Sequence, residues 1–256
     1  MANVVKTRLE GPVFYISINR PEKKNCINHE TARQLVTAFE KFNEDENAKV
    51  AVFHGEGSNF CTGYDLSEVS RGDFEHYDPD FLEKYRYLGP TNMKIKKPLI
   101  AAIEGYAVAG GLELSLMADM RVCGKSATFG VFCRKVGVPL IDGGTIRLPR
   151  VVGFGRAMDM ILTGRGVGAE EALSWGLMNR VVSDGQAVAE ATKLAQQIAS
   201  FPEQCMLADR NSSYYSLDHT TEESFAREYE NISVLGESIK GAQQFMQSQA
   251  KKKSKL

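Results

Sequence analysis

Residues 97–119, KPLIAAIEGYAVAGGLELSLMAD, constrain the fold of this chain more than any other segment. Residues 99–103 form a short apolar run after a proline, as expected for a buried strand. From Gly110 onward the apolar residues recur at helical spacing, and Glu113 falls within the first turn. This spacing places the Glu113 carboxylate on the same helix face as the Gly110 N–H group. The segment therefore predicts a strand, a glycine turn and a helix that begins beside a carboxylate.

Glu113 has two interpretations. A glutamate in the first turn can simply complement the positive end of the helix dipole. However, Glu113 lies between Leu112 and Leu114, and burial of an unpaired carboxylate is costly. This cost favours a functional role. Gly110 supports that interpretation, because a residue without a Cβ lets a ligand oxygen approach the unpaired N–H groups at the helix start.

The composition is that of an ordinary globular protein. With 256 residues and 43% hydrophobic content, the chain can bury a large core. A formal net charge of -1 gives no overall field for nucleic acid or an anionic membrane, and no apolar run is long enough to span a bilayer. The five cysteines and four histidines are scattered, without C-x-x-C pairs or metal-ligand spacing. We expect no nucleic acid, membrane or metal as a partner.

The sequence ends in Ser254, Lys255 and Leu256, after three further lysines. A terminal Ser-Lys-Leu tripeptide is the address that the peroxisomal import receptor reads. A basic tail that ends in this tripeptide by chance is the alternative. We expect a peroxisomal protein that has the import receptor as a partner.

Hydrophobic periodicity divides the chain into a mixed part and a helical part. Strands are expected at residues 4–9, 13–18, 49–55, 99–103, 120–123 and 128–132. Helices are expected from Gly110 and at residues 29–44, 80–94, 155–162, 169–175, 186–200, 201–214 and 220–249. The polar, unpatterned residues 71–79 are expected to form a mobile loop that can act as a lid. We therefore predict an α/β core over residues 1–185 and a helical region over residues 186–256.

Five segments carry a resemblance to a known family. They are RPEKKNCIN at residues 20–28, FCTGYDLSE at 60–68, the central segment at 97–119, FGVFCRKVGVPLIDGGTIRLPRVVG at 129–153 and LTGRGVGAEEALSWGLMNRVV at 162–182. On these motifs the chain resembles the crotonase superfamily, the enoyl-CoA hydratases and isomerases. The resemblance implies an α/β fold, a crotonase-like spiral of strand-strand-helix units with a C-terminal helical trimerisation region. It also implies a homotrimer, or a hexamer of paired trimers.

The resemblance further implies an oxyanion hole for the thioester carbonyl, formed by the N–H groups of Tyr64 and Gly110. Two preorganised donors in a dry site can each contribute about 3 to 4 kcal/mol to stabilising an enolate-like transition state. The resemblance assigns contacts with the coenzyme A part of an acyl-CoA substrate to Lys24, Tyr64, Asp65, Leu66 and Gly110, without a permanently bound cofactor. For Lys24, a simply solvated side chain is the competing interpretation.

The second catalytic acid is where this chain departs from the family. Hydratases of the superfamily place one glutamate on the central helix, matched by Glu113, and another at the position that is Cys133 here. A thiol with a pKa of about 8.5 is a poor proton donor. Asp142 offers a substitute, because dienoyl-CoA isomerases of the superfamily also place an aspartate in this loop. We predict that Asp142, rather than Cys133, supplies the second protic group, and a turn-capping role is the alternative for Asp142.

Three functions fit these residues. The one we expect is an enoyl-CoA hydratase or isomerase that acts on acyl-CoA thioesters through an oxyanion-hole-stabilised enolate in peroxisomal fatty-acid oxidation. The second is another crotonase chemistry, thioester hydrolysis or decarboxylation, which needs only the oxyanion hole and one acid. The third is a non-catalytic acyl-CoA binder, because Cys133 replaces the second family glutamate.

Overall fold

The computed structural model describes residues 3–72 and 78–253, with side chains as far as residue 248. The chain divides into two compact units, Met1–Gln196 and Gln197–Leu256. The boundary between them along the sequence falls inside helix α8 (Ala187–Ala199). Most of the predicted mobile loop at residues 71–79, and all of the terminal tripeptide, lie outside the described residues. The predicted boundary after residue 185 falls just before α8, most of which belongs to the first unit.

A six-stranded sheet runs through the first unit in the order β1-β2-β3-β4-β6-β9. The first two strands are antiparallel, and the other neighbouring pairs of this sheet are parallel. Every residue of β2 and β4 is buried, as expected for central strands that are covered on both faces. The strands are β1 (Val5–Glu10), β2 (Val13–Ile18), β3 (Val50–Gly55), β4 (Leu99–Ile103), β6 (Met120–Gly124) and β9 (Arg180–Val182).

A second, three-stranded sheet contains β5 (Tyr106–Val108), β7 (Thr128–Gly130) and β8 (Gly166–Gly168) in that order. Strand β7 is shorter than the strand predicted at residues 128–132, because the chain turns at residue 132 into a 3-10 helix. At three residues each, β5 and β8 are too short to give a periodic sequence signal. An isolated β-bridge joins Cys61 to Ala107 of β5, and it holds the loop that follows β3 beside this sheet.

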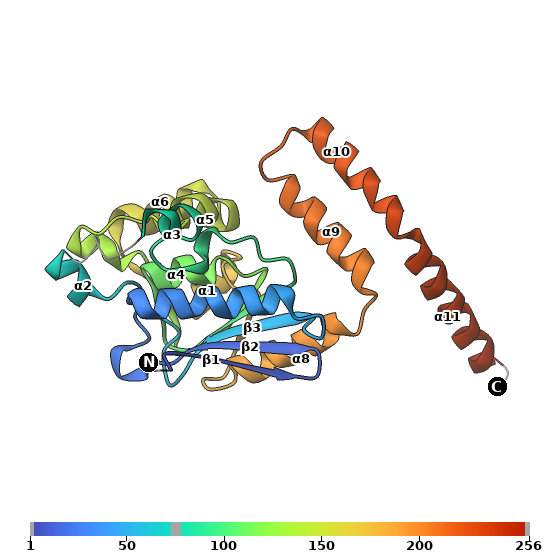
Figure 1. Cartoon of the computed structure of the whole chain (residues 1–256), viewed down its shortest axis with the longest axis horizontal. Coiled ribbons are helices and arrows are strands. Elements are labelled where there is room, and N and C mark those ends of the chain that lie inside the picture. The colour runs from blue at the N-terminus through green and yellow to red at the C-terminus, as the bar shows by residue number, and fades with distance from the viewer. Residues whose placement is uncertain (1–2, 73–77, 254–256) are drawn as a thin grey trace. The chain divides into compact units, whose positions relative to one another are not determined.

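Helix α1 (His29–Glu44) lies along strands β1 and β2 (Figure 1) and has the predicted bounds. The Asn28 side chain caps its N-terminus by accepting a hydrogen bond from an N–H group of the first turn. The helix buries Phe39 and Phe42, and the Phe42 ring lies 5.7 Å from the Phe14 ring of β2. This layer of side chains between helix and sheet is part of the hydrophobic core.

The remaining helices of the first unit fill the connections between the strands. They are α2 (Leu66–Arg71), α3 (Pro79–Lys84), α4 (Gly110–Ser115), α5 (Gly144–Val152), α6 (Phe154–Thr163) and α7 (Ala169–Ser174). The helix predicted at residues 80–94 is wrong. Arg86 and Gly89 have φ values of 83° and 89°, which end the helix, and a 3-10 turn at Pro90–Asn92 follows. Helix α5 is not expected from the sequence, because it begins at a glycine and contains Pro149.

The described residues of the second unit form helices joined by turns. Its helices are α9 (Glu203–Tyr215), α10 (Thr221–Tyr229) and α11 (Leu235–Lys253), and α9 contacts both of the others. A 3-10 turn, Glu230–Val234, interrupts the single helix predicted at residues 220–249. Among the described residues of the chain, no helix is both long and apolar enough to cross a membrane. The role of this unit in trimerisation stays a prediction.

Candidate active site

Helix α4 begins where the central segment turns out of β5. Ala109 precedes it with φ 52° and ψ -125°, a conformation that residues other than glycine seldom adopt. A Cβ on Gly111 would lie 2.0 Å from Cys61 O, and one on Gly110 would lie 2.7 Å from Leu88 Cδ1. Only glycine fits at position 111, and a side chain at position 110 would require Leu88 to move. Two distant segments of the chain therefore pack directly against the start of α4.

Glu113 is buried in the first turn of α4, with 3% of its surface exposed. Its Oε1 accepts hydrogen bonds from the Asp142 N–H at 3.0 Å and from the Gly144 N–H at 2.8 Å. No described residue donates a hydrogen bond to its Oε2. Two backbone donors therefore orient the carboxylate and leave one oxygen for a ligand.

The surroundings of Glu113 change its affinity for a proton. Burial, and secondly the negative charge of Asp142, raise the pKa of Glu113 from 4.5 to about 7. The hydrogen bonds from the Gly144 and Asp142 N–H groups oppose this shift without cancelling it. Near neutral pH the side chain therefore exists in both its acid and its base form. Such a group can accept a proton and return it.

The N–H groups of Tyr64 and Gly110, the predicted oxyanion hole, belong to adjacent segments. Ile27 donates its N–H to Gly63 O and accepts the Asp65 N–H, both at 2.8 Å. This pairing turns the Tyr64 N–H away from Ile27, because successive residues of a strand point their N–H groups to opposite sides. The Gly63 Cα lies 3.2 Å from the position of a Cβ on Gly110, and no described residue accepts the Gly110 N–H. Their binding of an oxyanion stays a prediction.

Asp142 lies close to Glu113, but its side chain binds another segment. The residue is buried, and its Oδ1 accepts the Leu88 N–H at 3.0 Å and the Thr91 hydroxyl at 2.6 Å. Burial raises the pKa of Asp142, and these two hydrogen bonds oppose the shift. The predicted neighbours Glu113 and Asp142 therefore share one buried site. The part of Asp142 in proton transfer stays a prediction.

Cys133 lies in the 3-10 helix Phe132–Val136 and is buried. Burial, and secondly the charge of Glu113, raise the pKa of its thiol. The thiol is therefore neutral at physiological pH and is a weak nucleophile. The influence of Glu113 on this pKa places Cys133 near the same carboxylate. A neutral, buried thiol suits a small apolar wall of the site better than a proton donor.

The sequence matches the enoyl-CoA hydratase/isomerase family over residues 8–252. The chain belongs to this family. A probable enoyl-CoA hydratase/isomerase from Mycobacterium abscessus has a TM-score of 0.86 and 35% identity, with 97% of each chain covered. The enoyl-CoA hydratase from Mycobacterium tuberculosis H37Rv has a TM-score of 0.89 and 32% identity, with 96% of this chain and 97% of that chain covered.

Two curated relatives of this enoyl-CoA hydratase/isomerase family member are named carnitinyl-CoA dehydratase. The Salmonella typhi protein is 39% identical over 192 residues, which are 74% of this chain and 72% of the relative. The Salmonella arizonae protein is 35% identical over 227 residues, which are 88% of this chain and 85% of the relative. The crotonase resemblance and the α/β fold are thereby confirmed. The chain is a crotonase-family enzyme that acts on acyl-CoA.

The predicted peroxisomal localisation is wrong. The two curated relatives described above are Salmonella proteins, and bacteria have no peroxisomes. A three-residue match at the end of a lysine-rich tail arises easily by chance, so Ser254-Lys255-Leu256 is a weak signal. With the localisation, the predicted import receptor loses its support as a partner.

Two of the predicted coenzyme A contacts of the crotonase enzyme lie on exposed surface. Lys24 follows a 3-10 turn, Pro21–Lys23, and its Nζ lies 5.4 Å from the centre of the Tyr106 ring. Leu66 is exposed at the start of α2. A cation and an apolar side chain are thus available here for a phosphate-bearing ligand.

Asp65, a third predicted contact, has a structural partner that the sequence does not reveal. Its Oδ2 pairs with the Arg20 guanidinium at 3.0 Å, and its Oδ1 accepts the Ser67 N–H at 3.1 Å. Burial alone would raise the pKa of Asp65, but hydrogen bonds from Ser67 and Arg20 hold it at about 2. The Arg20–Asp65 pair therefore connects the segment at residues 20–28 to the segment at residues 60–68. In the sequence, nothing distinguishes Arg20 from the lysines beside it.

Three further residues of the site are not singled out by the sequence. Leu88 and Thr91 bind Asp142, as described above. Arg147 of α5 donates hydrogen bonds to Asp142 O at 3.2 Å and to Thr91 O at 2.6 Å. The Gly89-Pro90 pair is the one sequence signal that a turn, rather than a helix, occupies this region.

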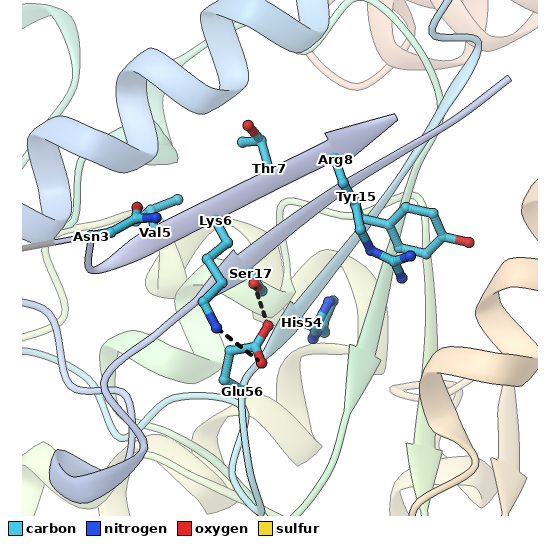
Figure 2. Close-up of a pocket in the computed structure, with 9 residues that line it drawn as sticks. All are labelled: Asn3, Val5, Lys6, Thr7, Arg8, Tyr15, Ser17, His54 and Glu56. Carbon is cyan, nitrogen blue, oxygen red and sulfur yellow. Dashed lines mark hydrogen bonds and ion pairs between the residues drawn. The ribbon is translucent and has the colours of Figure 1, made fainter. Parts of the chain in front are cut away.

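A cavity of about 630 Å³ lies elsewhere, on strands β1, β2 and β3 (Figure 2). Glu56 in this cavity already accepts the Ser17 hydroxyl at 2.7 Å and pairs with the Lys6 ammonium at 3.6 Å. The lining residues, none of them near Glu113 in the sequence or on α4, are Asn3, Val5, Lys6, Thr7, Arg8, Tyr15, Ser17, His54 and Glu56. Over the described part of the chain, no three His, Cys, Asp or Glu side chains are placed to hold a metal ion.

Proposed function

We propose that this crotonase enzyme adds water to acyl-CoA thioesters and removes it, with Glu113 as the group that moves the proton. The observation that carries the proposal is the buried Glu113 carboxylate, held by two backbone N–H groups, with a pKa of about 7. The carnitinyl-CoA dehydratase name of two relatives supports a reaction that removes or adds water. The adjacent Gly110 N–H supports binding of a thioester oxygen.

In the dehydration direction, the thioester oxygen accepts hydrogen bonds from the N–H groups of Gly110 and Tyr64. These donors stabilise the negative charge that develops when the α-carbon loses a proton. Glu113 Oε2 takes up that proton, and an enolate forms with its charge on the thioester oxygen. The enolate expels the β-hydroxyl group, which leaves as water when Glu113 returns the proton. The substrate thus loses one water, and Glu113 ends in the ionised state in which it began.

A single carboxylate explains how the chain can react without the second family glutamate. A group with a pKa of about 7 accepts a proton in one step and gives it up in the next without a large free-energy cost in either step. The neutral thiol of Cys133 then shapes the wall of the site. Double-bond isomerisation uses the same first step, with the proton returned to a different carbon.

The test is incubation with a panel of acyl-CoA thioesters, followed by mass spectrometry. Conversion of crotonyl-CoA into β-hydroxybutyryl-CoA, or the reverse, would support the proposal. Release of free coenzyme A would identify a thioester hydrolase, and release of carbon dioxide a decarboxylase. Double-bond migration without a change in mass would identify an isomerase. Tight binding without any product would identify a non-catalytic acyl-CoA binder.

We further propose that the coenzyme A part of the substrate lies against Lys24 and Leu66. Lys24→Ala should raise KM while kcat changes little, because phosphate contacts are equally strong in the ground state and the transition state. Lys23→Ala, in the same loop, is the matched control. An unchanged KM in Lys24→Ala would place the phosphates elsewhere.

A further inference from the structure

The turn at residues 85–92 is held from two sides. Gly89 has a φ of 89°, and a Cβ there would lie 2.4 Å from Ala32 O, so the turn packs directly on α1. On the other side, Arg147 of α5 donates a hydrogen bond to Thr91 O at 2.6 Å. Helices α1 and α5 therefore contact this turn at Gly89 and Thr91, whereas Leu88 has its backbone partner elsewhere.

Asp142 links this turn to Glu113. Its Oδ1 accepts the Leu88 N–H at 3.0 Å and the Thr91 hydroxyl at 2.6 Å, and all three residues are buried. The backbone N–H of Asp142 donates to Glu113 Oε1 at 3.0 Å. One residue thus holds the proton-transferring carboxylate with its main chain and the turn with its side chain.

Leu88 brings the turn against the predicted oxyanion hole. Its side chain is 1% exposed, and its Cδ1 lies 2.7 Å from the position of a Cβ on Gly110. The Leu88 methyl groups therefore lie against the side of Gly110 where a Cβ would stand. An N–H donor stabilises a developing oxyanion more strongly in dry surroundings, because its dipole is then less screened.

We propose that Asp142 is a positioning residue, which holds Leu88 against Gly110 through its Oδ1 and keeps the oxyanion hole dry and aligned with Glu113. This inference rests on the proposed function. The sequence predicts proton transfer by Asp142. For this, either Oδ1 would have to give up its hydrogen bonds from Leu88 and Thr91, or Oδ2 would have to accept the proton. A positioning role requires only an oxygen acceptor at this place, and neither a charge nor an ionisable proton.

Asparagine and alanine separate the two roles of Asp142. Asp142→Asn keeps an acceptor oxygen but cannot ionise, whereas Asp142→Ala loses the acceptor as well. For a positioning residue, kcat should fall about 100-fold in Asp142→Ala, with a smaller change in KM, and about fivefold in Asp142→Asn. Equal and large losses of kcat in both variants would assign proton transfer to Asp142 and overturn the proposal.

Thr91 offers a matched pair of variants that leaves both carboxylates intact. Thr91→Val removes the hydroxyl donor at nearly constant shape, whereas Thr91→Ser keeps the hydroxyl. We expect kcat to fall about tenfold in Thr91→Val and clearly less in Thr91→Ser. A Thr91→Val enzyme that is no slower than Thr91→Ser would contradict the proposal.

Hydrogen exchange at the Leu88 amide tests the same contact without any substrate. The amide should be protected in the wild type and in Asp142→Asn, and should lose protection in Asp142→Ala. If the wild type converts no thioester, the proposed function fails, but the exchange measurement still tests the link between Asp142 and Leu88. Equal protection of Leu88 in all three proteins would refute that link whatever the activities are.

Discussion

The two units of this chain differ in how far their apolar side chains are buried. Among the described residues, all the buried apolar side chains belong to the first unit. In the second unit, Phe225, Tyr229 and Phe245 are 68%, 73% and 61% exposed. Soluble proteins seldom leave so many large apolar side chains uncovered along one segment unless another surface meets them.

We propose that this difference separates the part of the chain that reacts from the part that assembles. The first unit has its own core and contains every residue of the proposed reaction. The second unit needs a surface that covers its apolar side chains, and we propose that another copy of the chain provides it, in a homotrimer or hexamer. The first unit also exposes apolar side chains on α6, where Phe154 and Leu162 are 72% and 70% exposed.

The largest effect is expected from Glu113→Gln in the first unit. Glutamine keeps an oxygen for the Asp142 and Gly144 N–H groups but cannot accept the α-proton. Turnover should therefore fall about 1,000-fold, with an unchanged circular dichroism spectrum. Glu170→Gln is the matched control, because Glu170 is also a first-turn glutamate but lies exposed on α7. Near-normal turnover in Glu113→Gln would refute the proposed mechanism.

The next largest effect is expected in the second unit, from Phe225→Glu combined with Tyr229→Glu on α10. Two charges in place of two aromatic rings should make the covering contact unfavourable, so the assembly should dissociate to smaller species. Analytical ultracentrifugation measures the change, and Glu228→Gln on the same helix is the control. A wild-type protein that sediments as a monomer at micromolar concentration would refute the proposed assembly.

A smaller effect is expected on the stability of the first unit. Burial and the Asp142 charge raise the pKa of Glu113 from 4.5 to about 7, so the folded chain binds this proton more tightly than the unfolded chain does. The contribution of Glu113 to stability is therefore greatest below pH 4.5 and is lost as the pH rises to about 7. Glu113→Gln should melt a few degrees above the wild type at about pH 8.

Calorimetry at two pH values checks this prediction. Below about pH 4.5 the two proteins should melt at similar temperatures, because Glu113 is then protonated in both the folded and the unfolded state. A melting temperature of Glu113→Gln that stays below that of the wild type near pH 8 would contradict a raised pKa.

The smallest effect is expected from Cys133→Ala, which should lower turnover about threefold or less, because no proton transfer is lost. A steady-state assay with the best thioester of the panel measures it. A loss as large as that of Glu113→Gln would move the catalytic role to the thiol. If Cys133→Glu hydrates the substrate faster than the wild type does, a carboxylate at position 133 is sufficient to restore the two-glutamate site of the family.

The sequence predicts the elements whose residues repeat over a long enough run. Helix α1 and strands β2 and β4 have the predicted bounds, because their apolar residues recur without interruption. Glu113 and Gly110 are predictable for a different reason, since a carboxylate among leucines beside two glycines is costly without a function. These inferences need only residues that are close together in the chain.

The rest of the site depends on contacts between distant segments. Asp142 binds Leu88 and Thr91 across 54 and 51 positions of the sequence, and no local pattern marks such a pair. The error at residues 80–94 has the same origin, because Gly89 packs on α1 and takes a positive φ there. Helical spacing of the neighbouring residues could not reveal that contact. The sequence therefore predicts the two carboxylates but not Leu88 and Thr91, which bind the side chain of Asp142.

The most direct test of Glu113 as the proton-transferring group is the fate of the α-hydrogen in deuterated water. The substrate is β-hydroxybutyryl-CoA, and mass spectrometry follows both deuterium uptake at the α-carbon and loss of water. We expect the wild type to form crotonyl-CoA and to incorporate deuterium at the α-carbon when heavy water adds back in the reverse reaction, and Glu113→Gln to do neither. Deuterium uptake that persists in Glu113→Gln, or release of free coenzyme A without any uptake, would contradict the role of Glu113.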